Sequence, residues 1–283
     1  MAKILPGGDE GLGAMQSLER AMRVLRSVAA AGPGGARLGD VAEATQLSRS
    51  TAHRFLGALA QAGLLEQDDA TASFHLGLEL CSLGARAANR YELRDVAEPM
   101  MQRLVERTGD TIYLSLRSGH DAVCVERIEG EFPIKTLTLD VGDRRPLGIG
   151  AGSLALLAFQ TDAVVEKAIA ANAIALRAFP GFETGAVFEM VAETKRQGYA
   201  FNNERLVPGM SALGVPVFGK NQTAIAALSV AAITTRMGPD RRANIIGWLS
   251  EEAKILEGRL ADITGGLTEQ TIRMLARRRR GAA

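Results

Sequence analysis

The glycine-rich segment at residues 147–153 (LGIGAGS) has the composition of an anion-binding turn, because it leads into a helix predicted at 154–159. The first N–H groups of a helix have no intrahelical acceptor, so they can bind a carboxylate. The spacing equally allows a glycine turn that serves only close packing. A nucleotide-binding P-loop is excluded, because no Gly-Lys-Ser/Thr follows.

Basic side chains form a second chemically informative group, between residues 47 and 65. Arg49, His53 and Arg54 occur there without any acidic residue, although acidic residues flank the stretch on both sides. Such donors at the start of a helix can reach phosphates and base edges in the major groove of DNA. The net charge of +1 does not identify a nucleic-acid-binding protein. The indication of DNA binding comes from the local cluster of basic residues.

The elements around the basic stretch are predicted in the order of a winged helix-turn-helix. A first helix is expected from Ser17 to the Gly-Pro-Gly-Gly run at 32–35, followed by a short helix at 38–44. Ser48 caps a third, basic helix that ends at Gly63, and strands at 64–66 and 73–76 form the wing. An arginine-bearing helix is commonly just a solvated surface, but this order favours DNA binding over a plain three-helix packing unit. The predicted DNA contacts are Ser48, Arg49, Ser50, Thr51, His53, Arg54 and, in the wing, Thr71.

The stretch at 47–56 (LSRSTAHRFL), with Leu59 and the Gly-Leu-Leu run at 63–65, resembles the recognition-helix signature of the IclR family of bacterial transcription regulators. The likeness extends through almost the whole chain. Gln46 is a departure, because the family often has glycine there, and a left-handed conformation would cost another residue about 1 kcal/mol. The resemblance implies that double-stranded operator DNA is the partner and that the chain forms a homodimer, often paired into a homotetramer.

The rest of the chain predicts a second, larger domain. A connecting helix at 78–89 and a helix at 91–107 precede strands at 111–117, 122–128, 134–139, 211–218 and 224–232, and a helix at 239–263 follows. The fold class is therefore α+β, and the resemblance implies a GAF-like effector-binding domain with an antiparallel sheet. The predicted organisation is a disordered tail at 1–14, the winged helix-turn-helix at 15–77, a linker helix at 78–90, the effector-binding domain at 91–265, and a helix end with a basic tail at 266–283.

The resemblance also implies a pocket on one side of the sheet that binds a small organic acid. Gly150 and Ala151 would offer N–H groups, Asn202 and Ser229 would bind a second polar group, and apolar residues would complete the walls. Asn202 stands where members often have an acid, and Ala212 stands where some have a cysteine. Because the expected residues are uncharged, the pocket suits a weak acid, aromatic or short aliphatic. The predicted effector-binding residues are Thr136, Gly150, Ala151, Asn202, Met210, Ala212, Ser229 and Ala231.

Several other classes of protein are disfavoured. The apolar stretches are shorter than the roughly 20 residues that cross a bilayer, and the first residues do not resemble a signal peptide, so we expect a cytoplasmic protein with no membrane partner. Cys81 and Cys124 lack metal-ligand spacing, so we predict two packing residues, with a redox-sensing thiol as the alternative, and no metal and no cofactor.

Catalysis is not predicted. The His120-Asp121 pair and Ser153 are the nearest approximations to catalytic groups, but they lack the arrangement of a nucleophile and its base. One alternative is kept open, in which the large domain only oligomerises and binds no ligand. The four arginines at 277–280 are predicted to be a solvated tail.

Overall fold

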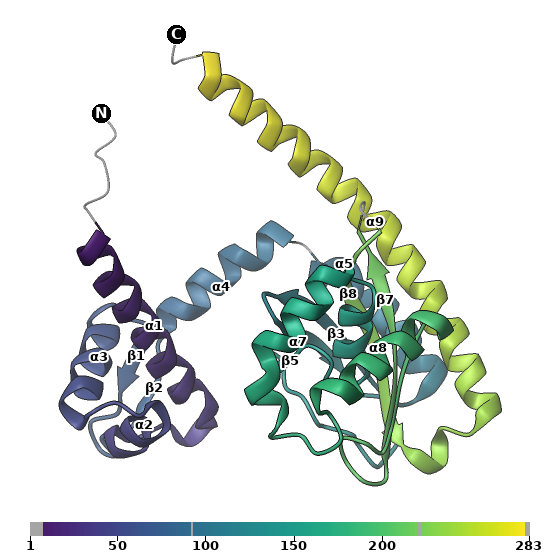
Figure 1. Ribbon diagram of the computed structural model, residues 1–283, viewed down its shortest axis with the longest axis horizontal. Coiled ribbons are helices and arrows are strands. Elements are labelled where there is room, and N and C mark those ends of the chain that lie inside the picture. The colour runs from purple at the N-terminus through teal and green to yellow at the C-terminus, as the bar shows by residue number, and fades with distance from the viewer. Residues whose placement is uncertain (1–7, 92, 220–221, 281–283) are drawn as a thin grey trace. The chain divides into compact units, whose positions relative to one another are not determined.

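The computed structural model describes the backbone of residues 8–91, 93–219 and 222–280, and the side chains of residues 16–84, 95–219 and 222–260. The chain separates into two compact units, one ending at Tyr91 and the other following it (Figure 1). The first contains α1 (Gly8–Ala30), the 3-10 turn η1 (Gly32–Gly34), α2 (Leu38–Thr45), α3 (Arg49–Gln61), β1 (Leu65–Gln67), β2 (Phe74–Leu76) and α4 (Leu78–Tyr91).

The first unit is the predicted winged helix-turn-helix. Its core contains Val24 and Val28 of α1, Leu56 and Leu59 of α3, and Phe74 of β2, among others, and all five side chains are buried. The strands β1 and β2 pair antiparallel, as expected for the wing. Gln46 adopts the left-handed conformation, with φ 55°, so the turn keeps its geometry despite lacking glycine.

The second unit is an antiparallel sheet between two layers of helices. The strand order is β5-β4-β3-β8-β7-β6. The strands are β3 (Thr111–Ser118), β4 (Asp121–Ile128), β5 (Arg144–Pro146), β6 (Ala200–Asn203), β7 (Met210–Phe218) and β8 (Ala224–Ile233). The helices are α5 (Leu93–Thr108), α6 (Ala151–Ala158), α7 (Asp162–Leu176), α8 (Thr184–Gln197) and α9 (Pro239–Arg280), with the 3-10 turn η2 (Thr234–Arg236) before α9.

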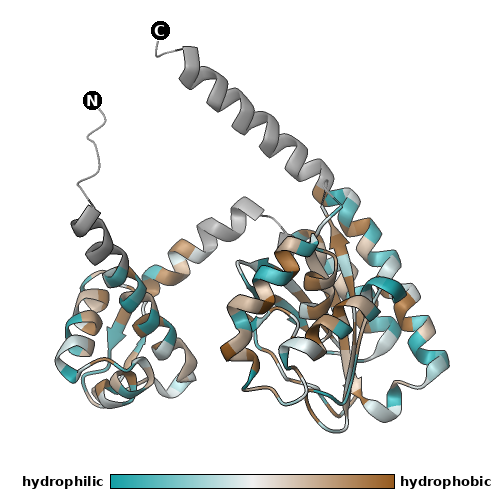
Figure 2. Cartoon of the chain, viewed as in Figure 1, coloured by the Kyte–Doolittle hydropathy of each residue, from teal (hydrophilic) through white to brown (hydrophobic). Residues whose placement is uncertain are grey.

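The two faces of the sheet differ because side chains alternate along a strand. On β8, Leu228 and Val230 join the apolar core under α5 and α9, while Ala227 belongs to the core beside α6, α7 and α8. Ser229 and Ala231 lie on that second face too, where the packing is not purely apolar. Figure 2 shows the hydrophobic residues along the strands and hydrophilic ones on the outer side of α9.

Three sequence predictions about element bounds are wrong. The first helix begins at Gly8, not after a tail reaching residue 14, since the segment before Ser17 contains acidic residues that favour a helix N-terminus. Residues 134–139 form no strand, because Pro133 lacks an N–H group and β5 pairs with β4 instead. The helix α9 continues past Gly265 and Gly266 to Arg280, because an interior glycine costs a helix only about 1 kcal/mol.

Candidate functional site

The helix α3 presents the predicted DNA-contacting side chains on its exposed surface. Ser48 caps the helix, since its Oγ accepts a hydrogen bond from the Thr51 N–H at 3.2 Å. Arg49, His53 and Arg54 are exposed, while Ala52 is buried against the domain core. The basic groups at the start of α3 are therefore free to meet a DNA groove.

The wing and the linker helix are attached to this unit by hydrogen bonds. In the wing, Asp68 Oδ1 accepts from the N–H groups of Thr71 and Ala70, both at 2.8 Å, and these bonds lower the pKa of Asp68. Thr71 lies exposed at the wing tip. At the start of α4, the Leu78 N–H donates to Glu66 Oε1 at 3.0 Å. The linker helix thus begins on the wing itself.

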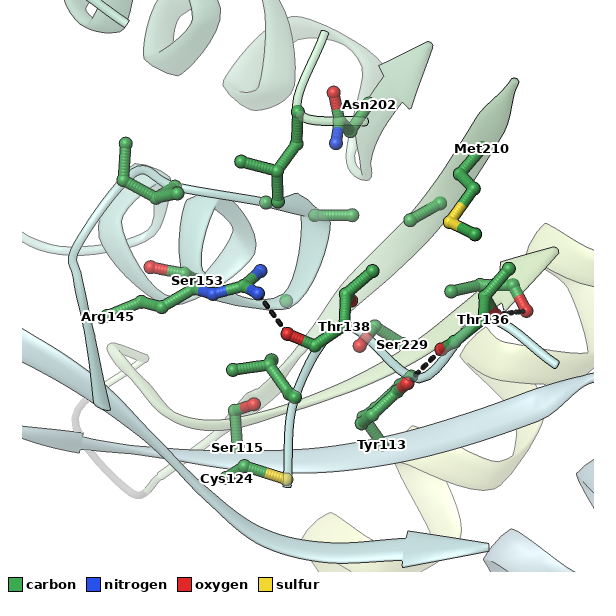
Figure 3. Close-up of a pocket in the computed structure, with 18 of the residues that line it drawn as sticks. Tyr113, Ser115, Cys124, Thr136, Thr138, Arg145, Ser153, Asn202, Met210 and Ser229 are labelled. Atoms are coloured by element: carbon green, nitrogen blue, oxygen red, sulfur yellow. Dashed lines mark hydrogen bonds between the residues drawn. The ribbon is translucent and has the colours of Figure 1, made fainter. Parts of the chain in front are cut away.

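The second unit contains a cavity of about 60 Å³ between the sheet, the start of α6 and the segment at residues 129–143 (Figure 3). This volume is several times the 10–15 Å³ or so that one water molecule needs. All eight predicted effector-binding residues line it: Thr136, Gly150, Ala151, Asn202, Met210, Ala212, Ser229 and Ala231. These eight came from the family resemblance, and the other 13 of the 21 lining residues were not predicted to bind the effector.

The glycine-rich turn forms the cavity wall at the N-terminus of α6. Gly150 is the N-cap, with φ 84°, and no side chain caps the helix. A Cβ atom on Gly152 would lie 2.9 Å from Ser229 Oγ, so glycine allows the helix to begin directly against the sheet. The first N–H groups of α6 therefore lie in the cavity wall without an intrahelical acceptor.

Arg145 is the most informative residue that the sequence analysis missed. Its half-buried side chain, on β5, extends into the cavity, where it donates a hydrogen bond to the Thr138 carbonyl (Figure 3). A Cβ atom on Gly150 would lie 3.6 Å from Arg145 Nη1, which places the guanidinium beside the turn before α6. The expectation of an uncharged pocket is therefore wrong. Burial lowers the pKa of Arg145, and among the described residues no carboxylate forms an ion pair with it.

Three polar side chains of the cavity have no hydrogen-bond partner among the described residues. They are the hydroxyls of Ser115 and Ser229 and the amide of Asn202, whose residues are 4%, 6% and 8% exposed. The Asn202 Oδ1 is completely buried and unpaired. The sequence analysis did not place three further strand residues in the cavity: Tyr113, Ser115 and Cys124. The alternation of side chains along β3 and β4 could have indicated that they share this face of the sheet.

The two cysteines differ in their environment. Cys81 is exposed, so its prediction as a packing residue is wrong, because it lies on the solvent side of α4. Cys124 is buried, as expected for a packing residue, and it also lines the cavity, which was not predicted. Burial, with a smaller contribution from Asp143, raises the pKa of the Cys124 thiol to about 11.

We expect Cys124 to resist alkylation in the folded protein. At pH 8 a thiol of pKa about 11 is about one part in a thousand thiolate, the reactive form. The Cys81→Ser variant, which retains Cys124 alone, should therefore remain unlabelled by iodoacetamide over a time that labels the same variant in denaturant completely. Rapid labelling of the native variant, measured by mass spectrometry, would contradict this environment for the thiol.

Two of the three side chains that most resembled catalytic groups have structural partners. The Ser153 hydroxyl donates to the Pro146 carbonyl and accepts from the Gly148 N–H, both at 3.0 Å. Asp121 pairs with Arg144 at 2.9 Å. Among the residues whose side chains are described, no group of three or more histidine, cysteine, aspartate or glutamate residues could hold a metal ion. No helix in the described part of the chain has the length and apolarity needed to cross a membrane.

Comparison with known proteins identifies both units. Residues 17–69 match the model of the IclR helix-turn-helix domain, and residues 85–257 match the model of the bacterial transcriptional regulator IclR C-terminal domain. The transcriptional regulator BhcR of Paracoccus denitrificans is 28% identical over 88% of both chains. The transcriptional regulator KipR of Bacillus subtilis is 26% identical, over 77% of this chain and 85% of its own.

Solved structures share the same architecture. An IclR transcriptional regulator from Alicyclobacillus acidocaldarius has a TM-score of 0.72 and 22% identity, over 87% of this chain and 98% of its own. An IclR homologue from Microbacterium hydrocarbonoxydans, solved with 4-hydroxybenzoate, has a TM-score of 0.69 and 24% identity, over 86% of this chain and 98% of its own. At these identities the likeness concerns the fold.

Proposed function

The chain belongs to the IclR family of bacterial transcription regulators, whose members are regulators and not enzymes, and we propose that a small organic acid bound in the cavity controls its action on operator DNA. The observation that carries this proposal is the position of Arg145 beside the free N–H groups of α6. A half-buried cation without a carboxylate partner is costly, and an anionic ligand removes that cost. The homologue solved with 4-hydroxybenzoate binds a molecule of this class.

A pair of chains is required on the DNA. One recognition helix contacts only a few base pairs, so tight binding needs two half-sites about one helical turn apart and a two-fold related partner. On α4, Leu78 and Leu83 are 74% and 49% exposed, and these two apolar side chains suit a contact with a second copy. The proposed assembly is a homodimer, or a tetramer of two such dimers.

The linker helix is the proposed route from the cavity to the DNA. Besides the bond from Leu78 to Glu66, the Gly77 N–H donates to the Leu64 carbonyl at 3.0 Å, directly after α3. A change in the direction of α4 would therefore carry the recognition helix with it. Effector binding would shift the population between two spacings of the paired α3 helices.

Selection of bound DNA sequences by the purified protein tests the DNA half of the proposal. We expect a two-fold symmetric consensus whose half-sites lie about one helical turn, 10 to 10.5 base pairs, apart. The same selection in the presence of candidate acids should weaken or strengthen recovery of that consensus. A consensus without symmetry would contradict the dimeric arrangement.

Thermal unfolding with a panel of carboxylic acids tests the sensing half. An acid at 100 times its dissociation constant stabilises a protein by about 2.7 kcal/mol, which raises the unfolding temperature measurably. The rival function, a large domain that only oligomerises, predicts no change with any acid and an operator affinity that no acid alters.

A further inference from the structure

We infer that the turn ending α5, at residues 108–110, is the coupling site between the cavity and the linker helix, with Phe132 and Arg236 as its positioning residues. This inference rests on the proposed function and deepens it, because it names the contacts through which a bound acid would act on α4. The turn and both positioning residues lie outside the cavity wall.

The sheet separates the cavity from α5. The cavity lies on the face beside α6, whereas α5 contributes Met101 and Leu104 to the apolar core on the opposite face. A ligand in the cavity therefore does not touch the helix that follows the linker. A displacement in the cavity can reach that helix through a segment that contacts both the cavity and the end of α5.

The segment at residues 129–143, here called the strap, contacts the cavity at its middle. Thr136, Thr138 and Leu139 line the cavity, and Figure 3 shows Thr136 and Thr138 there. The Thr136 hydroxyl donates to the Ala231 carbonyl on β8 at 2.7 Å. No residue of the strap belongs to a helix or a strand, so its position depends on such individual contacts. A ligand that displaces some of these contacts moves the strap.

The first part of the strap packs directly on the turn after α5. The Phe132 N–H donates to the Gly109 carbonyl at 3.0 Å. A Cβ atom on the buried Gly130 would lie 2.1 Å from the Gly109 carbonyl carbon and 2.6 Å from the Asp110 nitrogen. These contacts join backbone to backbone, so no side chain can adjust between them. Movement of the strap at residues 130–132 therefore moves the turn or breaks the contact.

Arg236, in η2, joins the strap and the turn through its side chain. Its guanidinium carbon lies 3.8 Å from the centroid of the Phe132 ring, which is a cation–π contact. Its Nε donates to Asp110 Oδ1 at 2.9 Å, and its Nη2 donates to the Thr108 carbonyl at 3.0 Å. Arg241 donates to the carboxylate of Asp110 at 2.8 Å as well, so this buried group keeps a partner if Arg236 is changed.

The turn continues into the helix that follows the linker. Thr108 is the last residue of α5, and its hydroxyl donates to the Leu104 carbonyl at 2.7 Å. Pro99 removes one backbone hydrogen bond of α5, but Met100 and Met101 beside it are fully buried and hold the helix in the core. Since α5 begins two residues after α4 ends, a displacement of its last turn is carried along a packed helix to the linker.

The test compares acid binding and operator binding by the full-length protein. Calorimetry measures the affinity for benzoate, 4-hydroxybenzoate, propionate and butyrate. Fluorescence anisotropy measures the operator affinity without acid and with a saturating concentration of the acid that binds most tightly. The ratio of these two operator affinities is the coupling ratio, which in regulated proteins is about 5- to 150-fold. Operator DNA must change the acid affinity by the same ratio, which provides an internal check.

Phe132→Ala removes the ring between the strap and Arg236, so the coupling ratio should fall to within about twofold of 1. The acid affinity without DNA should stay within about threefold, because Phe132 does not line the cavity. Phe132→Tyr keeps the ring and should keep the ratio. Leu137→Ala is the matched control, since Leu137 lies in the same strap, is 50% exposed and does not line the cavity.

Arg236→Gln removes the other partner of the same contact. Its coupling ratio should fall as in Phe132→Ala, and the double variant should lose no more than either single variant, because both changes break one connection. Thermal unfolding of each ligand-free variant shows that it is folded. A merely structural role of the two residues predicts a lower unfolding temperature with an unchanged coupling ratio.

Different results overturn the inference and the proposed function. If Phe132→Ala and Arg236→Gln bind the acid and keep the full coupling ratio, the inference is wrong while the proposed function stands. The inference is also wrong if both variants lose acid binding itself, because the residues then shape the cavity and do not couple it to the linker. If the unmodified protein binds none of the acids, or its operator affinity ignores them, the proposed function is wrong and the inference falls with it.

Discussion

Replacing Arg54 with alanine, and separately Arg49, is expected to weaken operator binding by roughly 1–3 kcal/mol, or about 5- to 150-fold, if each arginine binds a guanine edge. Both side chains are exposed on the first two turns of α3, and neither forms an ion pair with a described residue. The substitution therefore removes a contact with DNA and little else. Fluorescence anisotropy with the selected operator and with a random duplex of equal length measures the effect.

The ratio of the two affinities decides what each arginine contacts. A base contact gives a selective loss on the operator and a relaxed preference at one position, whereas a phosphate contact weakens both duplexes equally. Arg20→Ala provides a matched control, since Arg20 is an exposed arginine of α1, outside the helix-turn-helix. Full operator affinity in both the Arg49 and the Arg54 variants would contradict the role of α3 as the recognition helix.

The sequence predicted the first unit almost completely because its signals are local. The Ser48 cap, the left-handed Gln46 and the short strands of the wing each depend on neighbours a few residues away. The errors in element bounds have the opposite origin. The segment at 134–139 alternates like a strand, but β5 pairs with the edge of β4 instead. Which of two segments pairs with a given strand depends on tertiary contacts, and the local sequence pattern does not contain that information.

The cavity illustrates the same distinction. Its predicted lining residues came from a family resemblance. Six of them lie on β7, β8 and the start of α6, which pack together, whereas Asn202 lies on β6 and Thr136 lies in the segment at 129–143. Arg144 and Arg145 share the same local sequence context, yet Arg144 contacts Asp121 and Ser118 while Arg145 extends into the cavity. The local sequence does not distinguish the two arginines, and Arg145 was therefore not predicted. Alternation along β5 places adjacent side chains on opposite faces, but no sequence pattern marked these three residues as a strand.

The contact between α6 and β7 depends on Gly214, which pairs with Ser229 across the sheet. A Cβ atom on Gly214 would lie 2.6 Å from the Ala151 carbonyl oxygen and 2.9 Å from the Gly152 nitrogen, distances shorter than packed atoms allow. Both neighbouring atoms belong to backbone, so neither can move without shifting the N-terminus of α6. This single residue therefore controls the position of the N–H groups that are proposed to bind the carboxylate.

The Gly214→Ala variant is consequently expected to lose both stability and ligand affinity. Overpacking of this kind costs about 1–3 kcal/mol, which lowers the unfolding temperature of a unit of this size by about 2–4 °C per kcal/mol. Acid affinity should fall at least tenfold, because a binding group displaced by more than about 0.5 Å loses its geometry. Gly185→Ala in α8 is the control, since a Cβ atom there meets nothing within 4 Å and alanine favours a helix. If Gly214→Ala binds acids as tightly as the unmodified protein, the carboxylate does not bind at the N-terminus of α6, and Arg145 must hold it elsewhere in the cavity.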